Sequence, residues 1–228
     1  MRQESLNEFH SLGEYVSSPV FGIRDDTSLH VGLLPMPYVG NLQDATVYIL
    51  MLNPGLAPGD YFAEYEVRQF REAHIRNLRQ EFTAGDSPFL FLDPRFAWHP
   101  GFTYWHSKFA SIAQALAARK RITHAEALKH IAGCVASLEL IPYHSKNFGA
   151  GPLLKHLPSA RMMRNYVHEV LVPRAESNEI TVIATRGVRN WGLTPSANIL
   201  LYEGSETRSA HLTLGSRGGK RIAERLGL

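Results

Sequence analysis

Residues 45–60 read ATVYILMLNPGLAPGD, an apolar run followed by a run rich in proline and glycine. Its first half, residues 45–52, is almost entirely apolar and rich in Val, Ile and Tyr, which is typical of a strand buried on both faces of a parallel sheet. The run is well short of the ~20 apolar residues that a membrane helix needs. Its second half, residues 53–60, has the Asn, Pro and Gly of a turn. The sequence therefore predicts a polar loop at the carboxyl end of a buried strand.

Strands and helices alternate on either side of this stretch. Similar apolar runs predict strands over residues 135–141, 180–184 and 199–202, with a shorter strand at 89–92. Apolar residues spaced three to four apart predict helices over 5–16, 61–82, 104–118, 123–132, 159–172 and 217–227. This alternation predicts a three-layer α/β/α fold around a mostly parallel central sheet.

The composition is that of an ordinary globular protein. The chain has 228 residues, of which 44% are hydrophobic and 20% charged, and this favours one domain over residues 1–228 with a lead-in helix and loop over 1–40. The single cysteine, Cys134, excludes an internal disulfide and any multi-thiolate metal site. The first ten residues, MRQESLNEFH, lack the apolar core of a secretory signal. We therefore predict a cytoplasmic protein without a membrane span.

Charge is unevenly distributed along the chain. Residues 1–100 carry seven arginines against 13 acidic residues, whereas residues 101–228 carry 17 basic residues against eight acidic ones. A basic surface formed by the second half would attract a polyanion such as DNA. The alternative is a solvated surface whose charges have no partner.

Several common catalytic and cofactor motifs are missing from the sequence. It has no Walker A motif, no GxGxxG, no GxSxG and no HExxH. The eleven histidines show no compact ligand spacing with acidic residues. We predict neither a metal site nor a cofactor.

A ligand site is expected beyond the carboxyl ends of the strands, where open parallel sheets form their crevice. Polar and aromatic residues cluster in four segments that follow predicted strands, namely residues 53–56, 142–145, 185–187 and 204–216. These segments should converge on one site.

Two stretches of the sequence resemble a known family. YILMLNPGLAPGD (48–60) resembles the first motif of the uracil-DNA glycosylase superfamily, in its mismatch-specific branch, and FAWHPGFTYWHSKFASIAQAL (96–116) is similar to the segment in which those enzymes place His, Pro, Gly and an aromatic before a helix. With TRGVRNWGL (185–193), the resemblance covers about residues 45–225. The family's second motif, a His-Pro-Ser or Asn-Pro-Ser loop, has no counterpart in SETRSAHLTLGSRGGK (205–220).

The resemblance implies a DNA-repair hydrolase of that family's fold, which cleaves the N-glycosidic bond of a base flipped out of DNA. Such hydrolysis needs a positioned water on the sugar and hydrogen-bond donors at the departing base. Asn53 resembles the family's water-positioning residue. His144 and His211 are candidate donors, because imidazole titrates near neutral pH; a structural role is the alternative for each.

Further residues are expected to bind the base and the DNA backbone. The base-binding candidates are Pro54, Gly55, Leu56, Tyr61, Tyr143 and Phe148, since glycine lets the backbone approach a flat ring and aromatics can stack on it. The phosphate-binding candidates are Arg186, Lys146 and Arg208. The aromatics could equally belong to the core, and Arg186 to a salt bridge.

Two other functions remain open from the sequence. One is a non-catalytic nucleic-acid-binding module of the same fold, and the other is a hydrolase acting on a small nucleotide. The expected partner is DNA, and the expected state is a monomer.

Overall fold

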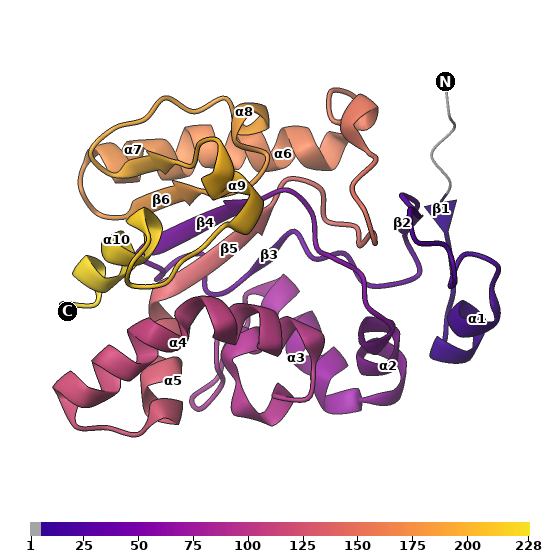
Figure 1. Ribbon diagram of the computed structural model, residues 1–228, viewed down its shortest axis with the longest axis horizontal. Coiled ribbons are helices and arrows are strands. Elements are labelled where there is room, and N and C mark those ends of the chain that lie inside the picture. The colour runs from indigo at the N-terminus through magenta and orange to yellow at the C-terminus, as the bar shows by residue number, and fades with distance from the viewer. Residues whose placement is uncertain (1–5) are drawn as a thin grey trace.

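A computed structural model describes residues 6–228, and a five-stranded sheet lies at its centre (Figure 1). The strands follow the order β3-β5-β4-β6-β7 across the sheet. Strands β4 to β7 pair in parallel, and only β3 runs antiparallel, against β5. The strands span Tyr38–Val39 (β3), Val47–Met51 (β4), Val135–Glu139 (β5), Thr181–Ala184 (β6) and Ile199–Leu201 (β7).

The central strand β4 is buried on both faces, as its sequence predicts. Val47 and Ile49 belong to one hydrophobic core, whereas Tyr48 and Leu50 belong to a second core on the other face of the sheet. Alternate residues of a strand point to opposite faces, so each face of β4 packs under its own layer of helices. The three-layer α/β/α fold with a mostly parallel sheet is therefore confirmed.

The first helical layer lies below the sheet in Figure 1 and includes the longest helix, α4. Its helices are α2 (Pro58–Glu66), α3 (Arg68–Arg79), α4 (Pro100–Lys120) and α5 (His124–Cys134). The C-terminal helix α10 (Arg217–Arg225) packs on α4 and adds Ile222 to the same core. A capping box begins α5, because Thr123 and Glu126 exchange hydrogen bonds there.

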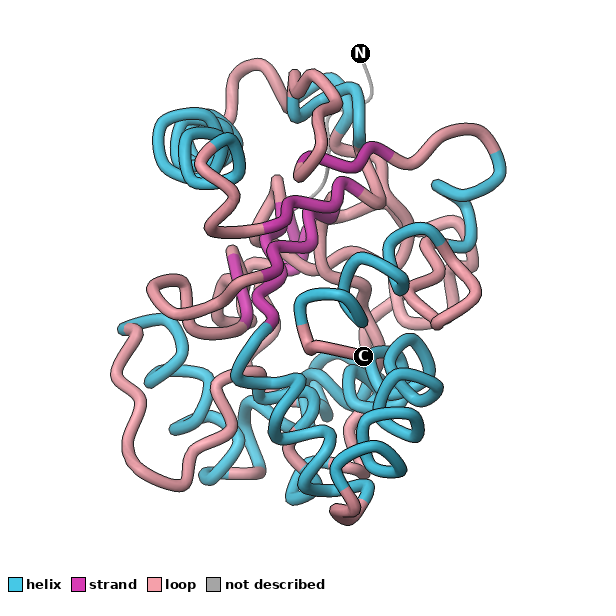
Figure 2. The backbone as a smooth tube through the Cα atoms, turned by 90° about the vertical axis from the view of Figure 1, so that its left-hand side faces the viewer, coloured by secondary structure: helices cyan, strands magenta, loops and turns pink. Residues whose placement is uncertain are grey.

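The second layer covers the opposite face and lies above the sheet in Figure 1, and Figure 2 shows the sheet between the two helical layers. It consists of α6 (Pro158–Tyr166), a π-helical turn (Val167–Leu171), α7 (Val172–Glu176) and α8 (Val188–Trp191). The predicted helix over 159–172 thus continues to Glu176. A short helix, α9 (Ser205–Ser209), follows β7.

The N-terminal region packs beside one end of the sheet (Figure 1). Two short strands, β1 (Leu6–Asn7) and β2 (Leu29–His30), pair in parallel, and α1 (Leu12–Ser17) lies between them in the chain. The helix predicted over 5–16 therefore begins only at Leu12, and the prediction is wrong for residues 6–11. Ser11 accepts a hydrogen bond from the Glu14 amide and starts the helix there; residues 1–5 lie outside the described part of the chain.

Two other expectations need correction. The single helix predicted over 61–82 is two helices, because the backbone leaves the helical conformation at Val67, with φ −112° and ψ 87°. The apolar spacing continues across this break, so periodicity alone hides it. The strand predicted over 89–92 is instead a 3-10 turn at Leu90–Leu92, since a short buried apolar run does not distinguish a strand from a turn.

Within residues 6–228, the structure has no helix that is both long enough and apolar enough to cross a membrane.

Candidate functional site

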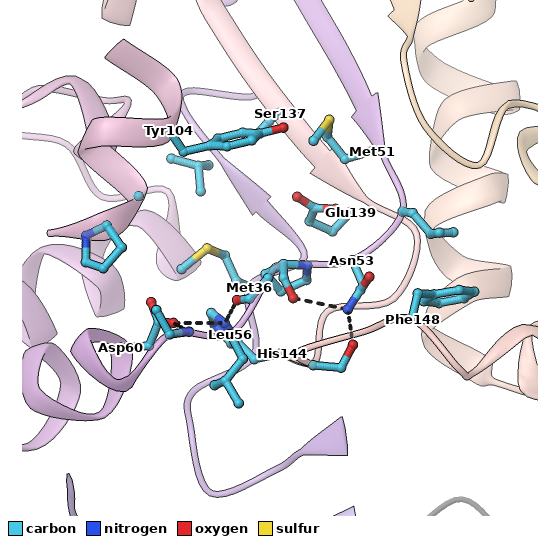
Figure 3. A pocket seen from close by; sticks show the side chains of 18 of the residues that line it. Met36, Met51, Asn53, Leu56, Asp60, Tyr104, Ser137, Glu139, His144 and Phe148 are labelled. Atoms are coloured by element: carbon cyan, nitrogen blue, oxygen red, sulfur yellow. Dashed lines mark hydrogen bonds and ion pairs between the residues drawn. The ribbon is translucent and has the colours of Figure 1, made fainter. Parts of the chain in front are cut away.

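A cavity of about 500 Å³ opens beyond the carboxyl ends of β4 and β5. This volume lies in the range of small-molecule sites. Figure 3 shows its polar and aromatic side chains facing one another across the opening. The residues that line it include Met36, Met51, Asn53, Pro54, Gly55, Leu56, Asp60, Tyr104, Trp105, Ser137, Glu139, His144, Ser145, Lys146, Phe148 and Arg186.

Two loops that follow neighbouring strands are joined at the mouth of the cavity. The Ile141 amide donates to the Leu52 carbonyl at 2.9 Å, and the Ser145 amide donates to the Pro54 carbonyl at 3.2 Å. These backbone bonds extend the pairing of β4 with β5 beyond the sheet. They bring Asn53 beside residues 143–145, which are about 90 positions away in the chain.

The amide of Asn53 is held in one orientation. Its Nδ2 donates to Ser145 Oγ at 2.8 Å, to the Pro54 carbonyl at 3.1 Å and to the Tyr143 carbonyl at 3.4 Å. Because all three partners accept hydrogen bonds, Nδ2 must face them, and the carbonyl oxygen Oδ1 faces the other way (Figure 3). Oδ1 is therefore presented to the cavity as an acceptor.

His144 is buried, and its ring is fixed by the same loop. Nδ1 lies 2.7 Å from the Gly55 carbonyl, which can only accept, so Nδ1 carries a hydrogen. In the neutral ring, Nε2 is then an acceptor. The expected role of His144 as a donor to a departing base therefore requires a ring that carries hydrogens on both nitrogens. The carboxylate oxygen Oδ2 of Asp60 lies 4.0 Å from Nδ1.

Glu139, the last residue of β5, places a buried carboxyl in the cavity wall. Burial raises its pKa to about 8, against the opposing effect of the nearby Arg186 guanidinium. The carboxyl is therefore mostly neutral at pH 7. Among residues 6–228, its Oε2 finds no hydrogen-bond partner.

Tyr104 and Arg186 lie on the side of the cavity formed by α4 and the loop after β6. Burial raises the pKa of Tyr104 to about 12, so its phenol stays neutral. The Arg186 guanidinium donates to the Arg208 carbonyl at 3.1 Å. This bond uses the backbone of Arg208, so Arg186 keeps further donors for a ligand.

Asp60, which is partly buried, and the buried His99 pack against the loop that follows β4. Asp60 Oδ2 accepts a hydrogen bond from the Ala57 amide at 2.6 Å, and its Oδ1 lies 3.4 Å from His99 Nε2. His99 in turn caps α4 through Nδ1, which accepts from the Gly101 amide at 2.9 Å. Burial lowers the pKa of His99 to about 4, so its ring is neutral at pH 7. The pair thus connects the start of α2 to the start of α4.

Two of the expected base-binding side chains lie outside the cavity. Tyr61 is 0% exposed, and its ring stacks on Tyr15 with centroids 4.8 Å apart while its hydroxyl contacts His30. Tyr143 packs against the core on the α6 side of the sheet and contributes only its carbonyl, to Asn53. The remaining base-binding candidates, Pro54, Gly55, Leu56 and Phe148, all line the cavity.

The fourth expected segment, residues 204–216, does not reach the cavity. It follows β7, which is the edge strand of the sheet and is separated from β4 by β6. His211 lines a separate hollow together with Tyr202 and Ser216, and Arg208 is exposed on α9. The structure therefore brings together Asn53, His144, Lys146 and Arg186, and leaves His211 and Arg208 apart.

Sequence reasoning missed three polar residues of the cavity. Glu139 is the one charged residue of the mainly apolar stretch 135–141, and this departure from the pattern of a buried strand was the available signal. Tyr104 and Asp60 lie inside the two segments that carry the family resemblance, but nothing in their spacing predicts that they face one cavity.

Over residues 6–228, no group of three or more His, Cys, Asp or Glu side chains is arranged to hold a metal ion. Comparisons with known protein families, with curated proteins and with solved structures gave no match.

Proposed function

We propose that this protein hydrolyses the N-glycosidic bond of a base that has been flipped out of DNA into the cavity, with Asn53 holding the attacking water. The fixed amide of Asn53, whose carbonyl oxygen faces the cavity, is the observation that carries the proposal. A water that donates a hydrogen to Oδ1 keeps a lone pair free for attack on the sugar carbon. An amide orients water without removing its proton, so the expected chemistry is slow.

The cavity is lined by side chains that can pack against a flat ring. Phe148 and Tyr104 lie at opposite ends of the view in Figure 3, and Met36 and Met51 add apolar contacts. Aromatic and thioether groups pack well against a planar base. Unstacking a base from DNA costs a few kcal/mol. Such contacts, with a few hydrogen bonds, offset this cost when the base enters a pocket.

Charge at the cavity supports departure of the base. When the glycosidic bond breaks, the electron pair stays on the base and the sugar becomes cationic, so a positive group near the base stabilises the transition state. Arg186 lines the cavity and is permanently charged. His144 can add a second donor in its protonated form.

A second candidate is hydrolysis of a free nucleoside or nucleotide. It is favoured by the separation of Arg208 and His211 from the cavity, which leaves Lys146 and Arg186 as the basic residues that line it. Two cations suit a ligand with one or two phosphates as well as they suit a DNA strand.

The test is release of free base under single-turnover conditions. Labelled oligonucleotides carrying uracil, hypoxanthine or mismatched thymine, single-stranded and double-stranded, are incubated with the protein, and abasic sites are detected by alkaline cleavage. We expect the fastest release from single-stranded or mismatched uracil, where the base is easiest to expose. Deoxyuridine and its monophosphate, assayed in parallel, test the second candidate.

Asn53→Ala should reduce release by at least about 100-fold, since positioning of a reacting group is commonly worth that much. The matched control is Asn190→Ala, an exposed asparagine on α8 that does not line the cavity. No release from any DNA substrate, with release from deoxyuridine, would replace the first function by the second.

A further inference from the structure

Glu139 is the one carboxyl that the sheet itself contributes to the cavity wall, among residues 6–228. Figure 3 shows its side chain turned into the space between Tyr104, Met36 and Asn53. Ser137, two residues earlier on the same face of β5, also lines the cavity. A polar strip therefore interrupts a face that is otherwise packed with apolar residues.

One oxygen of this carboxyl lacks a hydrogen bond within the described part of the chain. Oε2 is buried without a hydrogen-bond partner among residues 6–228, although buried polar atoms are nearly always paired. The last torsion of a glutamate side chain is broad, so rotation about it can exchange the two oxygens and present either one to the cavity. An unpaired carboxyl at a cavity wall is available to form a hydrogen bond with a ligand.

We propose that Glu139, as a neutral acid, donates its hydrogen to an acceptor atom on the far edge of the bound ring, and so selects uncharged rings that carry a carbonyl oxygen or ring nitrogen there. The inference rests on the proposed function in one respect, namely that the ring is a nucleobase. Because the glycosidic nitrogen must face Asn53 and its water, the opposite edge of the ring faces the wall.

The groups around Glu139 favour a neutral acid over a carboxylate. Tyr104 on α4 is a neutral phenol, Met51 is the neighbour of Glu139 on strand β4, and Trp105 adds a further apolar group to the cavity lining. Arg186, after β6, is the cation that acts on Glu139, and it forms no ion pair with it within 4.0 Å. The effect of burial on the pKa of Glu139 is therefore larger than the effect of this one cation. A cationic ligand would be repelled by Arg186.

The experiment measures binding of two small probes by ligand-observed NMR titration at pH 6.5 and pH 9. 1-Methyluracil carries a carbonyl oxygen and an N–H on the edge far from its methylated nitrogen, whereas 1-methylpyridin-2-one keeps the ring and the near oxygen but has no polar atom on the far edge. We expect at least tenfold tighter binding of 1-methyluracil at pH 6.5. At pH 9 its binding should weaken about tenfold, because with a pKa of about 8 only about one-tenth of the protein keeps the acid hydrogen.

Two variants separate this role from simple packing. Glu139→Gln keeps a donor at every pH, so the preference for 1-methyluracil should persist and its pH dependence should vanish. Glu139→Leu should abolish the preference at both pH values. An unchanged preference in Glu139→Leu, or an unchanged pH dependence in Glu139→Gln, would overturn the proposal.

The outcomes are independent of the base-release assay. Probe binding that follows the expected pattern without release of any base would contradict the proposed function and leave the role of Glu139 intact. If base is released from DNA but neither variant changes probe binding, the proposed function stands and the role of Glu139 is contradicted.

Discussion

The orientation of one side-chain amide determines the chemistry that the cavity can support. Asn53 has three acceptors around Nδ2, of which Ser145 Oγ is the nearest at 2.8 Å. The two backbone carbonyls at 3.1 and 3.4 Å are longer contacts. Ser145 is therefore the side chain that holds the Asn53 carbonyl toward the cavity.

Removing this hydroxyl should slow base release while leaving binding nearly unchanged. A neutral hydrogen bond contributes ~1 kcal/mol, so Ser145→Ala should lower the single-turnover rate about fivefold to tenfold. The rate and the half-saturating protein concentration are measured together. Ser137→Ala, a second serine of the cavity wall that does not contact Asn53 in the structure, is the control. Equal losses in the two variants would contradict a positioning role.

Glu139 should also make the stability of the protein depend on pH. Its pKa is about 8 in the folded protein and near 4.5 in the unfolded chain. Between these values the unfolded chain releases a proton that the folded protein keeps, so the free energy of unfolding falls as pH rises through this window. Below pH 4.5 both states are protonated, and no loss remains.

Glu139→Gln removes this titration. At pH 9 the free energy of unfolding of this variant should exceed that of the natural protein by roughly 2 to 5 kcal/mol. This difference should be smaller at pH 5. Urea unfolding at pH 5 and pH 9 measures the difference. A difference that is the same at both pH values would mean that Glu139 is already ionised in the folded protein.

Among the helices and strands, the strongly patterned ones were predictable and the short or interrupted ones were not. The buried runs at 45–52, 135–141 and 180–184 are strands because alternate residues face two cores, which requires apolar residues at nearly every position. The two-residue strand β3 carries no such pattern, and its pairing with β5 depends on a contact with residues about 100 positions away. The break at Val67 was equally hidden, because α3 continues the apolar spacing of α2.

The site was partly predictable for a related reason. Position after a buried strand identified the loops at 53–56 and 142–145, since all parallel strands deliver their carboxyl ends to one edge. The same rule failed for residues 204–216 because it does not say which strand lies at the edge of the sheet. Glu139 and Tyr104 reach the cavity from inside a strand and a helix, where the rule does not apply.

Across the whole molecule, the charges at the cavity should control association with DNA. Lys146 is exposed and lines the cavity together with Asn53, Pro54 and Gly55. A lysine that neutralises one phosphate releases counterions, so log K should fall with log salt by about 0.7 to 0.9 per contact. Binding of a single-stranded oligonucleotide should therefore weaken steeply between 50 and 200 mM salt, as fluorescence anisotropy can measure.

Lys146→Glu should flatten this salt dependence. Lys129→Glu is the matched control, because Lys129 is exposed on α5, which leads into the amino end of β5 and so lies away from the cavity. Equal slopes for both variants, or binding that ignores salt, would place the DNA elsewhere or favour a small nucleotide as the ligand.

The fate of the water oxygen tests the proposed hydrolysis more directly than any other measurement. A uracil-containing oligonucleotide is reacted under single-turnover conditions in water enriched in ¹⁸O, and the intact strand is analysed by mass spectrometry after immediate reduction of the abasic aldehyde. If water held by Asn53 attacks the sugar, the strand loses the mass of the base and gains one ¹⁸O, and Asn53→Ala shows neither change. A strand that keeps its base, or loses it without taking up ¹⁸O, would contradict the proposed hydrolysis.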